Sequence, residues 1–196
     1  SAKKLAFSNG SSIRVGTSLR SGTLQYLHIS EFGKICAKYP EKAEEIISGS
    51  LNTVEAGCFV FIESTAEGAW GRFYDMCMEA RGKAVDKLSK LDYRFFFFPW
   101  WRDPSYSMDE TVEDPDTTSY LDYLSETSEI ELTEGQRNWY SAKKRTQRGK
   151  MKQEYPSTPE EAFERVAEYA VYGAEMRAAH EDGRIGRLPY EIGYPV

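Results

Sequence analysis

Short apolar segments separated by polar turns dominate the first sixty residues. Two extended segments, 5–7 and 12–15, flank the polar turn Ser8-Asn9-Gly10-Ser11, and this pattern predicts a β-hairpin. Residues 24–29 predict a mostly apolar strand, and a helix is expected to follow from about 32 to 48.

Residues 58–98 continue the alternation of strands and helices. The unbroken apolar run 58–62 is typical of a strand buried on both faces. A helix should follow, because apolar residues recur at steps of three or four and share one face: Trp70, Phe73, Cys77, Ala80, Ala84 and Leu88. A third buried strand is expected over 93–98, ended by Pro99. This order predicts an α/β fold with a mainly parallel sheet flanked by helices.

Charge changes abruptly in the second half of the chain. Residues 103–134 contain eleven acidic residues and no lysine or arginine, whereas residues 137–152 contain seven basic residues and no acid. Two capping boxes, Thr133 with Gln136 and Thr158 with Glu161, predict helices that begin near 134 and 159. We expect a last helix over about 173–181 and a linker over 188–196.

The amino-acid composition excludes some classes of protein and favours others. The net charge of −6 argues against a polybasic surface binder, and a 40% hydrophobic content is enough for a sizeable core. The longest uncharged apolar run, 95–101, is far shorter than the about 20 residues that span a bilayer, and the chain opens on no secretory signal. Three widely spaced cysteines favour a reducing cytoplasm, and only two histidines exclude multi-histidine metal sites.

Two strand ends carry the candidate chemistry. Ser30 and Glu31 follow the strand 24–29, at the sheet edge where α/β proteins bind ligands, and a carboxylate there can polarise a water or help hold Mg²⁺. Glu63, Ser64 and Thr65 follow the next strand in the same way. Both sets are also typical of ordinary helix caps and solvated loops.

Two enzyme classes are disfavoured at these positions. A nucleophile elbow at Ser64 would need glycine where Ile62 and Ala66 stand. A glycosidase pair of Glu31 and Glu63 is a weak signal in a chain with 31 acidic residues.

Two basic features complete the candidates. Arg20 lies on a small-residue loop and could serve as an arginine finger, or could simply be an exposed solubilising arginine. The basic stretch 143–152 is dense enough to contact DNA phosphates, and it could equally be a solvated helix face that balances the preceding acidic segment. Its candidate DNA-binding residues are Lys143, Lys144, Arg145 and Arg148.

Five short motifs, taken in order, resemble the large subunit of tailed-bacteriophage terminases, the ATPase motor that packages viral DNA. They are Phe7-Ser8-Asn9-Gly10-Ser11-Ser12-Ile13, Leu27-His28-Ile29-Ser30-Glu31, Phe61-Ile62-Glu63-Ser64-Thr65-Ala66-Glu67-Gly68, Phe98-Pro99-Trp100 and Gln153-Glu154-Tyr155-Pro156-Ser157-Thr158-Pro159-Glu160-Glu161-Ala162-Phe163.

The resemblance implies a P-loop-class (ASCE) ATPase that uses ATP and Mg²⁺. Glu31 would match the catalytic Walker B glutamate, and Ser30 would stand at the Walker B aspartate position, holding Mg²⁺ weakly or through water. Glu63, Ser64, Thr65 and Ala66 would match the motif that couples hydrolysis to DNA movement, and Arg20 would stand where some family members carry a trans-acting arginine finger. The implied partners are double-stranded DNA, the portal protein, the terminase small subunit and further copies in a ring, within the bacterial host cytoplasm.

One departure from the family is clear. No Gly-x-x-x-x-Gly-Lys-Ser/Thr loop occurs in the 196 residues. We therefore expect a middle piece of the motor, with residues 1–153 as the C-terminal half of the ATPase domain and 154–196 as a helical linker toward the nuclease domain. Alone, such a piece should neither hydrolyse ATP nor cleave DNA. A different P-loop nucleic-acid motor, such as a helicase, and a non-catalytic docking module remain alternatives.

Overall fold

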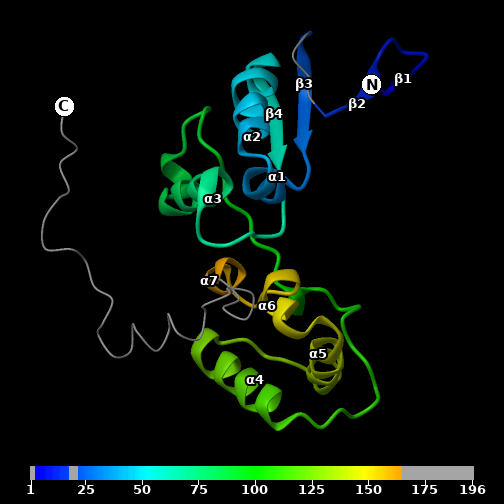
Figure 1. Cartoon of the computed structure of the whole chain (residues 1–196), viewed down its shortest axis with the longest axis vertical. Coiled ribbons are helices and arrows are strands. Elements are labelled where there is room, and N and C mark those ends of the chain that lie inside the picture. The colour runs from blue at the N-terminus through cyan, green and yellow to red at the C-terminus, as the bar shows by residue number, and fades with distance from the viewer. Residues whose placement is uncertain (1–2, 18–21, 165–196) are drawn as a thin grey trace, which may run out of the picture.

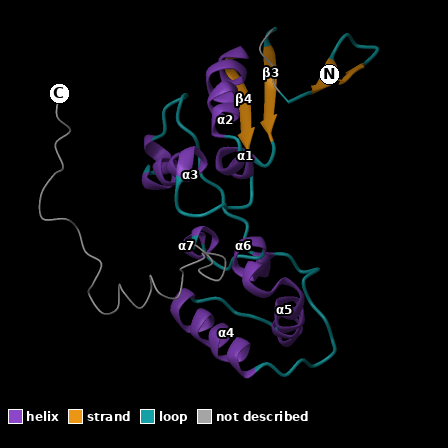
Figure 2. Ribbon diagram, in the orientation of Figure 1, coloured by secondary structure: helices purple, strands orange, loops and turns teal. Residues whose placement is uncertain are grey.

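The computed structural model describes residues 3–17 and 22–164, which form an α/β structure with two parallel strands flanked by helices (Figures 1 and 2). The strands are β1 (Lys3–Ala6), β2 (Ser12–Val15), β3 (Leu24–Ile29) and β4 (Val54–Ile62). The α-helices are α1 (Phe32–Lys38), α2 (Pro40–Glu45), α3 (Gly71–Gly82), α4 (Pro115–Ser128), α5 (Glu134–Gln147), α6 (Met151–Glu154) and α7 (Pro159–Phe163).

The predicted N-terminal hairpin is confirmed. β1 and β2 pair antiparallel, with Leu5 opposite Ile13 and Lys4 opposite Arg14. Every residue of both strands is exposed, and Figure 1 shows the hairpin standing apart from the helices.

The parallel pair of β3 and β4 forms the centre of the α/β lobe, which we define as residues 24–82. The two strands run in register from Tyr26 opposite Phe59 to Ile29 opposite Ile62. Alternate residues of both strands join the side chains of α1, α2 and the following turn in one core, whose buried members are Leu27, Ile29, Phe32, Cys36, Ala43 and Ile46.

The prediction that residues 58–62 are buried on both faces is wrong. Val60 and Ile62 pack against the core, but Phe59 and Phe61 are 54% and 55% exposed on the other face. Helices cover only one face of the pair, so the strand alternates between buried and exposed residues as a half-covered strand does.

The helix expected over 32–48 is divided at Tyr39. Pro40 clashes with a helical conformation at the residue before it, and Tyr39 adopts φ −139° and ψ 63°. A new helix, α2, begins on Pro40, and a π-helical turn, Ile46–Ser50, ends the segment.

Two further predictions in this region are corrected. The helix expected to reach Leu88 ends at Gly82, and Trp70 lies at its N-cap, 48% exposed, rather than on a buried face. Residues 93–98 do not form a strand: their side chains alternate between half-buried and exposed, but no neighbouring strand pairs with them among the described residues.

The helical lobe, residues 100–155, has its own core. Trp100, Leu121, Leu124, Tyr140 and Met151 are buried together between α4, α5 and α6. The predicted capping box of α5 is present, with Gln136 N donating to Thr133 Oγ1 at 3.2 Å and Thr133 N donating to Gln136 Oε1 at 3.0 Å.

Helix α7 joins the two lobes. Phe163 packs its ring on Phe73 and Tyr74 of α3, and Gln153 Nε2 donates to the carbonyl of Ala66 at 2.8 Å. The predicted cap of α7 is confirmed on one side, because Glu161 N donates to Thr158 Oγ1. The Glu161 carboxylate accepts from Ser157 N, one residue before the position that a capping box would use.

Some predictions lie outside the described residues. These are Arg20, the helix expected over 173–181 and the linker over 188–196. The expected boundary at 153–154 falls within α6. Within residues 3–17 and 22–164, no helix combines the length and the apolar character that a membrane span needs.

Candidate functional site

The candidate site is the carboxyl edge of the β3–β4 pair, where both predicted motifs meet. Ile29 and Ile62 lie opposite each other as the last residues of the two strands. Beyond them, Glu63 N donates to the Ile29 carbonyl at 3.0 Å, and Phe32 N donates to the Glu63 carbonyl at 3.1 Å. These two bonds hold residues 29–32 and 63 side by side, as the topology of a parallel sheet requires.

Glu31 occupies a strained position at this edge. Its backbone lies in the left-handed region, with φ 57° and ψ 35°, as it caps the N-terminus of α1. A non-glycine residue there costs about 1–3 kcal/mol, and such residues cluster at functional sites. This backbone conformation turns the chain from β3 directly into α1. The Glu31 side chain is only partly exposed.

Lys34 is the close partner of Glu31. Its ammonium lies 2.7 Å from Glu31 Oε2, in an i,i+3 ion pair on the first turn of α1. This contact with the carboxylate raises the pKa of Lys34 above its usual value. Both side chains remain partly exposed, so the pair is a weak contribution to stability and can open to admit another group.

Ser64 and Thr65 lie on the first turn of α1. A Cβ added at Gly33 would meet the Thr65 carbonyl at 2.8 Å and Ser64 Oγ at 2.9 Å, so only glycine permits this approach. The Ser64 and Thr65 hydroxyl oxygens are shielded from solvent and make no hydrogen bond to any described residue. Unpaired buried hydroxyls are unfavourable and call for an explanation, such as a ligand or a segment that completes the site.

Glu63 and Ser30, unlike Ser64 and Thr65, are exposed. Glu63 Oε1 lies 3.3 Å from His28 Nε2, and both side chains are well exposed on the uncovered face of the strands. Ser30 is exposed between β3 and Glu31. The structure thus brings together the predicted residues Ser30, Glu31, Glu63, Ser64 and Thr65, with Glu63 already paired to a histidine.

These residues do not form a metal site by themselves. The described part of the chain holds no group of three or more His, Cys, Asp or Glu side chains placed to bind a metal ion. The Lys34 ammonium also stands beside Glu31 Oε2, where a cation would bind.

The three cysteines are free thiols in the structure, and Cys36 and Cys77 are not activated as nucleophiles. Burial raises the pKa of the Cys77 thiol to about 11 and also raises that of Cys36. A thiol with a raised pKa is protonated at neutral pH, which favours a packing role for both.

Several residues of the basic stretch 143–152 already contact other residues of the helical lobe. Lys144 Nζ donates to Thr117 Oγ1 at 2.8 Å, and Arg145 donates to the Glu113 carbonyl at 3.0 Å. Lys143 Nζ lies 5.2 Å from the centre of the Tyr155 ring. These contacts tie the basic stretch to the acidic segment, and Arg148, with φ 50°, ends α5 on the exposed surface.

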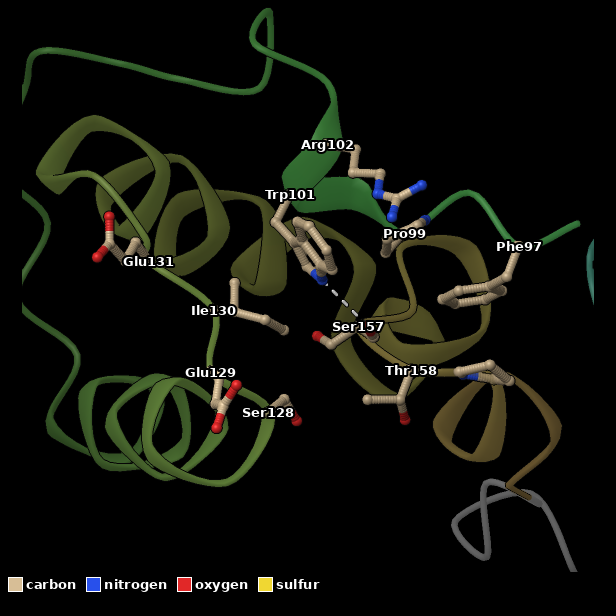
Figure 3. Close-up of a pocket in the computed structure, with 11 residues that line it drawn as sticks. Phe97, Pro99, Trp101, Arg102, Ser128, Glu129, Ile130, Glu131, Ser157 and Thr158 are labelled. Atoms are coloured by element: carbon tan, nitrogen blue, oxygen red, sulfur yellow. Dashed lines mark hydrogen bonds between the residues drawn. The ribbon is translucent and has the colours of Figure 1, made fainter.

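A pocket of about 430 Å³ lies where the helical lobe meets residues 97–99 and 157–159, and the sequence pattern did not indicate it (Figure 3). It opens between the α4–α5 connection and the start of α7, and Trp101 Nε1 donates to the Ser157 carbonyl at its centre at 3.1 Å. The Ser157 hydroxyl is already bonded to Trp100 and Tyr120, so it is not available as a nucleophile. The aromatic sequence 95–101 is a signal for such a pocket, but the same residues also predict a buried strand.

Comparisons of the chain with protein-family models, with curated proteins and with solved structures found no match in any of the three.

Proposed function

We propose that this chain is the hydrolysis and coupling part of an ATP-driven DNA-packaging motor of the terminase large-subunit type, with a P-loop-class fold. The observation that carries the proposal is the convergence of Glu31 and Ser64-Thr65 at one carboxyl edge of a parallel strand pair. The five motifs that resemble the family lie in the matching order along the chain.

In this function Glu31 is the carboxylate that orients and deprotonates the attacking water. Its left-handed backbone fixes the side chain at the edge, and the partly exposed ion pair with Lys34 can exchange for water. A positioned general base contributes about 10²–10⁴ in rate.

Ser64 and Thr65 are the coupling element. Both hydroxyls are buried without a hydrogen-bond partner among the described residues, and the Ser64 hydroxyl lies next to Gly33, so a phosphate or a water at the edge would give them hydrogen bonds that these residues do not supply. Their backbone contacts α1 and continues toward α3, and this path can pass a change at the site to the helices.

ATP and Mg²⁺ would come to this edge together. Mg²⁺ is bound through one or two carboxylates plus nucleotide phosphates and waters, which suits an edge with Glu31 as its candidate carboxylate and Ser30 nearby. The loop that cradles the triphosphate is not among these 196 residues, so this function assigns it to another segment. The same proposal includes the partners that the family resemblance implies, which are the portal protein, the small subunit and further copies in a ring. It also includes Arg20 as an arginine finger.

The decisive experiment replaces Glu31 in the full-length motor protein. Glu31→Gln keeps the size of the side chain but removes the base, so ATP binding should persist while DNA-stimulated hydrolysis falls by about 10²–10⁴. Glu55→Gln is the matched control, since Glu55 is exposed at the opposite end of β4. Retention of more than about a tenth of the wild-type turnover by Glu31→Gln would assign the base to another residue.

A further inference from the structure

The N-terminal hairpin differs in charge from the rest of the chain. Residues 1–23 contain four basic residues and no acidic one, whereas the remaining residues carry a net charge of −10. A basic segment on an acidic protein is the electrostatic signature of contact with a polyanion.

The register of the hairpin separates its basic and apolar residues. Lys4 and Arg14 are directly opposite each other and therefore share one face. Leu5, Ile13 and Val15 lie on the other face, together with Lys3. The ribbon thus presents one basic face and one mainly apolar face.

Lys4 and Arg14 have no acidic partner in the part of the chain that the structure describes. Within residues 3–17 and 22–164 neither side chain forms an ion pair or a hydrogen bond. Like charges directly opposite each other destabilise a strand pair, so an anion between them would stabilise the hairpin. In α5, by contrast, Lys144 and Arg145 already bond to the acidic segment.

The shape of the hairpin suits a groove. It stands apart from the helices in Figure 1, and its turn, Ser8-Asn9-Gly10-Ser11, carries only small polar side chains. Asn9 Oδ1 accepts from Ser11 N at 3.1 Å and keeps the turn tight. The major groove of B-form DNA is wide enough for a two-stranded ribbon of this kind.

We propose that the β1–β2 hairpin binds double-stranded DNA, with the Lys4–Arg14 face in the major groove. This inference rests on the proposed function, which makes duplex DNA the substrate of the motor. It assigns the DNA contact to the hairpin in place of the basic stretch 143–152.

The test is fluorescence anisotropy of a labelled 24-base-pair DNA duplex with the 196-residue chain, titrated between 50 and 200 mM salt. Each phosphate contact contributes about 0.9 to the slope of log K against log salt, or about a threefold loss of affinity over this range. Lys4→Gln and Arg14→Gln should each reduce that slope by about 0.9, and the double variant by about twice as much.

Lys3→Gln is the matched control. It removes the same charge one residue away, but on the opposite face, so its slope should equal that of the wild type. Equal losses in Lys3→Gln and Lys4→Gln would overturn the proposed face. Absence of duplex binding, or a slope that falls only in Lys144→Gln and Arg148→Gln, would overturn the hairpin as the DNA site. Circular dichroism should show that all variants are folded.

A second arm tests the groove. Duplex RNA of the same sequence has the same charge but a deep and narrow major groove that a ribbon cannot enter. We expect it to bind at least tenfold more weakly than duplex DNA, and equal affinity would overturn major-groove binding. Anionic vesicles that compete as well as duplex DNA would instead indicate a lipid surface. These measurements need no nucleotide, so their failure is distinct from a failure of the Glu31→Gln experiment.

Discussion

The two lobes of this chain satisfy their polar groups to different degrees. In the helical lobe, the Tyr120 hydroxyl lies 2.7 Å from Ser157 Oγ and 2.6 Å from Glu161 Oε1, and Trp100 donates to the same Ser157 oxygen. In the α/β lobe, by contrast, Ser64 and Thr65 have buried hydroxyls that no described residue hydrogen-bonds. The helical lobe therefore supplies hydrogen-bond partners for these buried polar groups itself. The α/β lobe leaves two buried hydroxyls for another group to bond.

The same contrast holds for apolar surface. Trp100 and Tyr140 are 2% exposed, and burial raises the pKa of the Tyr120 and Tyr140 hydroxyls far above their usual range. In the α/β lobe, Phe59 and Phe61 lie on a face that no described element covers. Parallel strands are almost always covered on both faces, so the α/β lobe has the character of a structure completed by further chain or by a partner.

The largest effect is expected in the core of the helical lobe. Leu121 is fully buried between α4 and α5, so Leu121→Ala should lower the free energy of unfolding by about 2–5 kcal/mol. Urea unfolding followed by tryptophan fluorescence measures this, because Trp100, Trp101 and Trp139 all lie in this lobe. Leu91→Ala is the control: Leu91 is 93% exposed, and a change of about 0.5 kcal/mol or less is expected. Similar losses in both variants would mean that the helical core is not packed as described.

A smaller effect is expected where the α/β lobe forms the candidate site. Gly33→Ala places a methyl group 2.8 Å from the Thr65 carbonyl, so the coupling segment must move. Overpacking of this kind costs about 1–3 kcal/mol, and urea unfolding followed by circular dichroism would detect it. The matched variant Gly82→Ala meets nothing within 4 Å at the end of α3 and should leave stability unchanged or slightly raised. A neutral Gly33→Ala would show that residues 64–65 do not lie on α1.

Local signals in the sequence predicted the parts of the fold that depend on neighbouring residues. The Asn-Gly turn, the apolar run ending at Ile29 and the caps at Thr133 and Thr158 act within a few residues, and each is present. Pro40 is an equally local signal, because a proline disfavours helical backbone at the residue before it, and a continuous helix over 32–48 does not take it into account.

Features that depend on distant partners could not be predicted in the same way. Residues 93–98 have strand-like composition, yet a strand exists only where another strand pairs with it. Helix α4 is not among the predicted elements although Asp114-Pro115 is a good helix start, because the acidic run 103–134 by itself indicates only a change in charge. The sequence predicted that Glu31 and Ser64 lie at one sheet edge, but not that Gly33 would receive residues 64–65, since that contact is tertiary.

The junction between the lobes should respond to the loss of a single cap. Thr158→Ala removes the oxygen that accepts from Glu161 N at 3.2 Å, and such changes cost about 0.5–2 kcal/mol. Because α7 carries Phe163 onto α3, the variant should also expose Cys77, whose alkylation rate reports on this contact. Thr118→Ala, on the exposed first turns of α4, is the control and should change neither quantity. If Thr158→Ala leaves alkylation unchanged, α7 does not depend on its cap for docking.

The smallest effect is expected on the uncovered face of the strands. Phe61 lies opposite His28 and stacks near Phe59, with 6.3 Å between ring centres, and it is 55% exposed on a face that no described helix covers. Phe61→Thr retains a residue that favours strands and removes only a cross-strand contact, so it should cost about 1 kcal/mol or less. Ile62→Thr, one residue further on the covered face, removes apolar contact with the core and should cost more. Chemical denaturation of the two variants decides whether both faces are buried in solution. Equal costs would mean that the face of Phe61 is already covered, and the contrast between a complete and an incomplete lobe would then be lost.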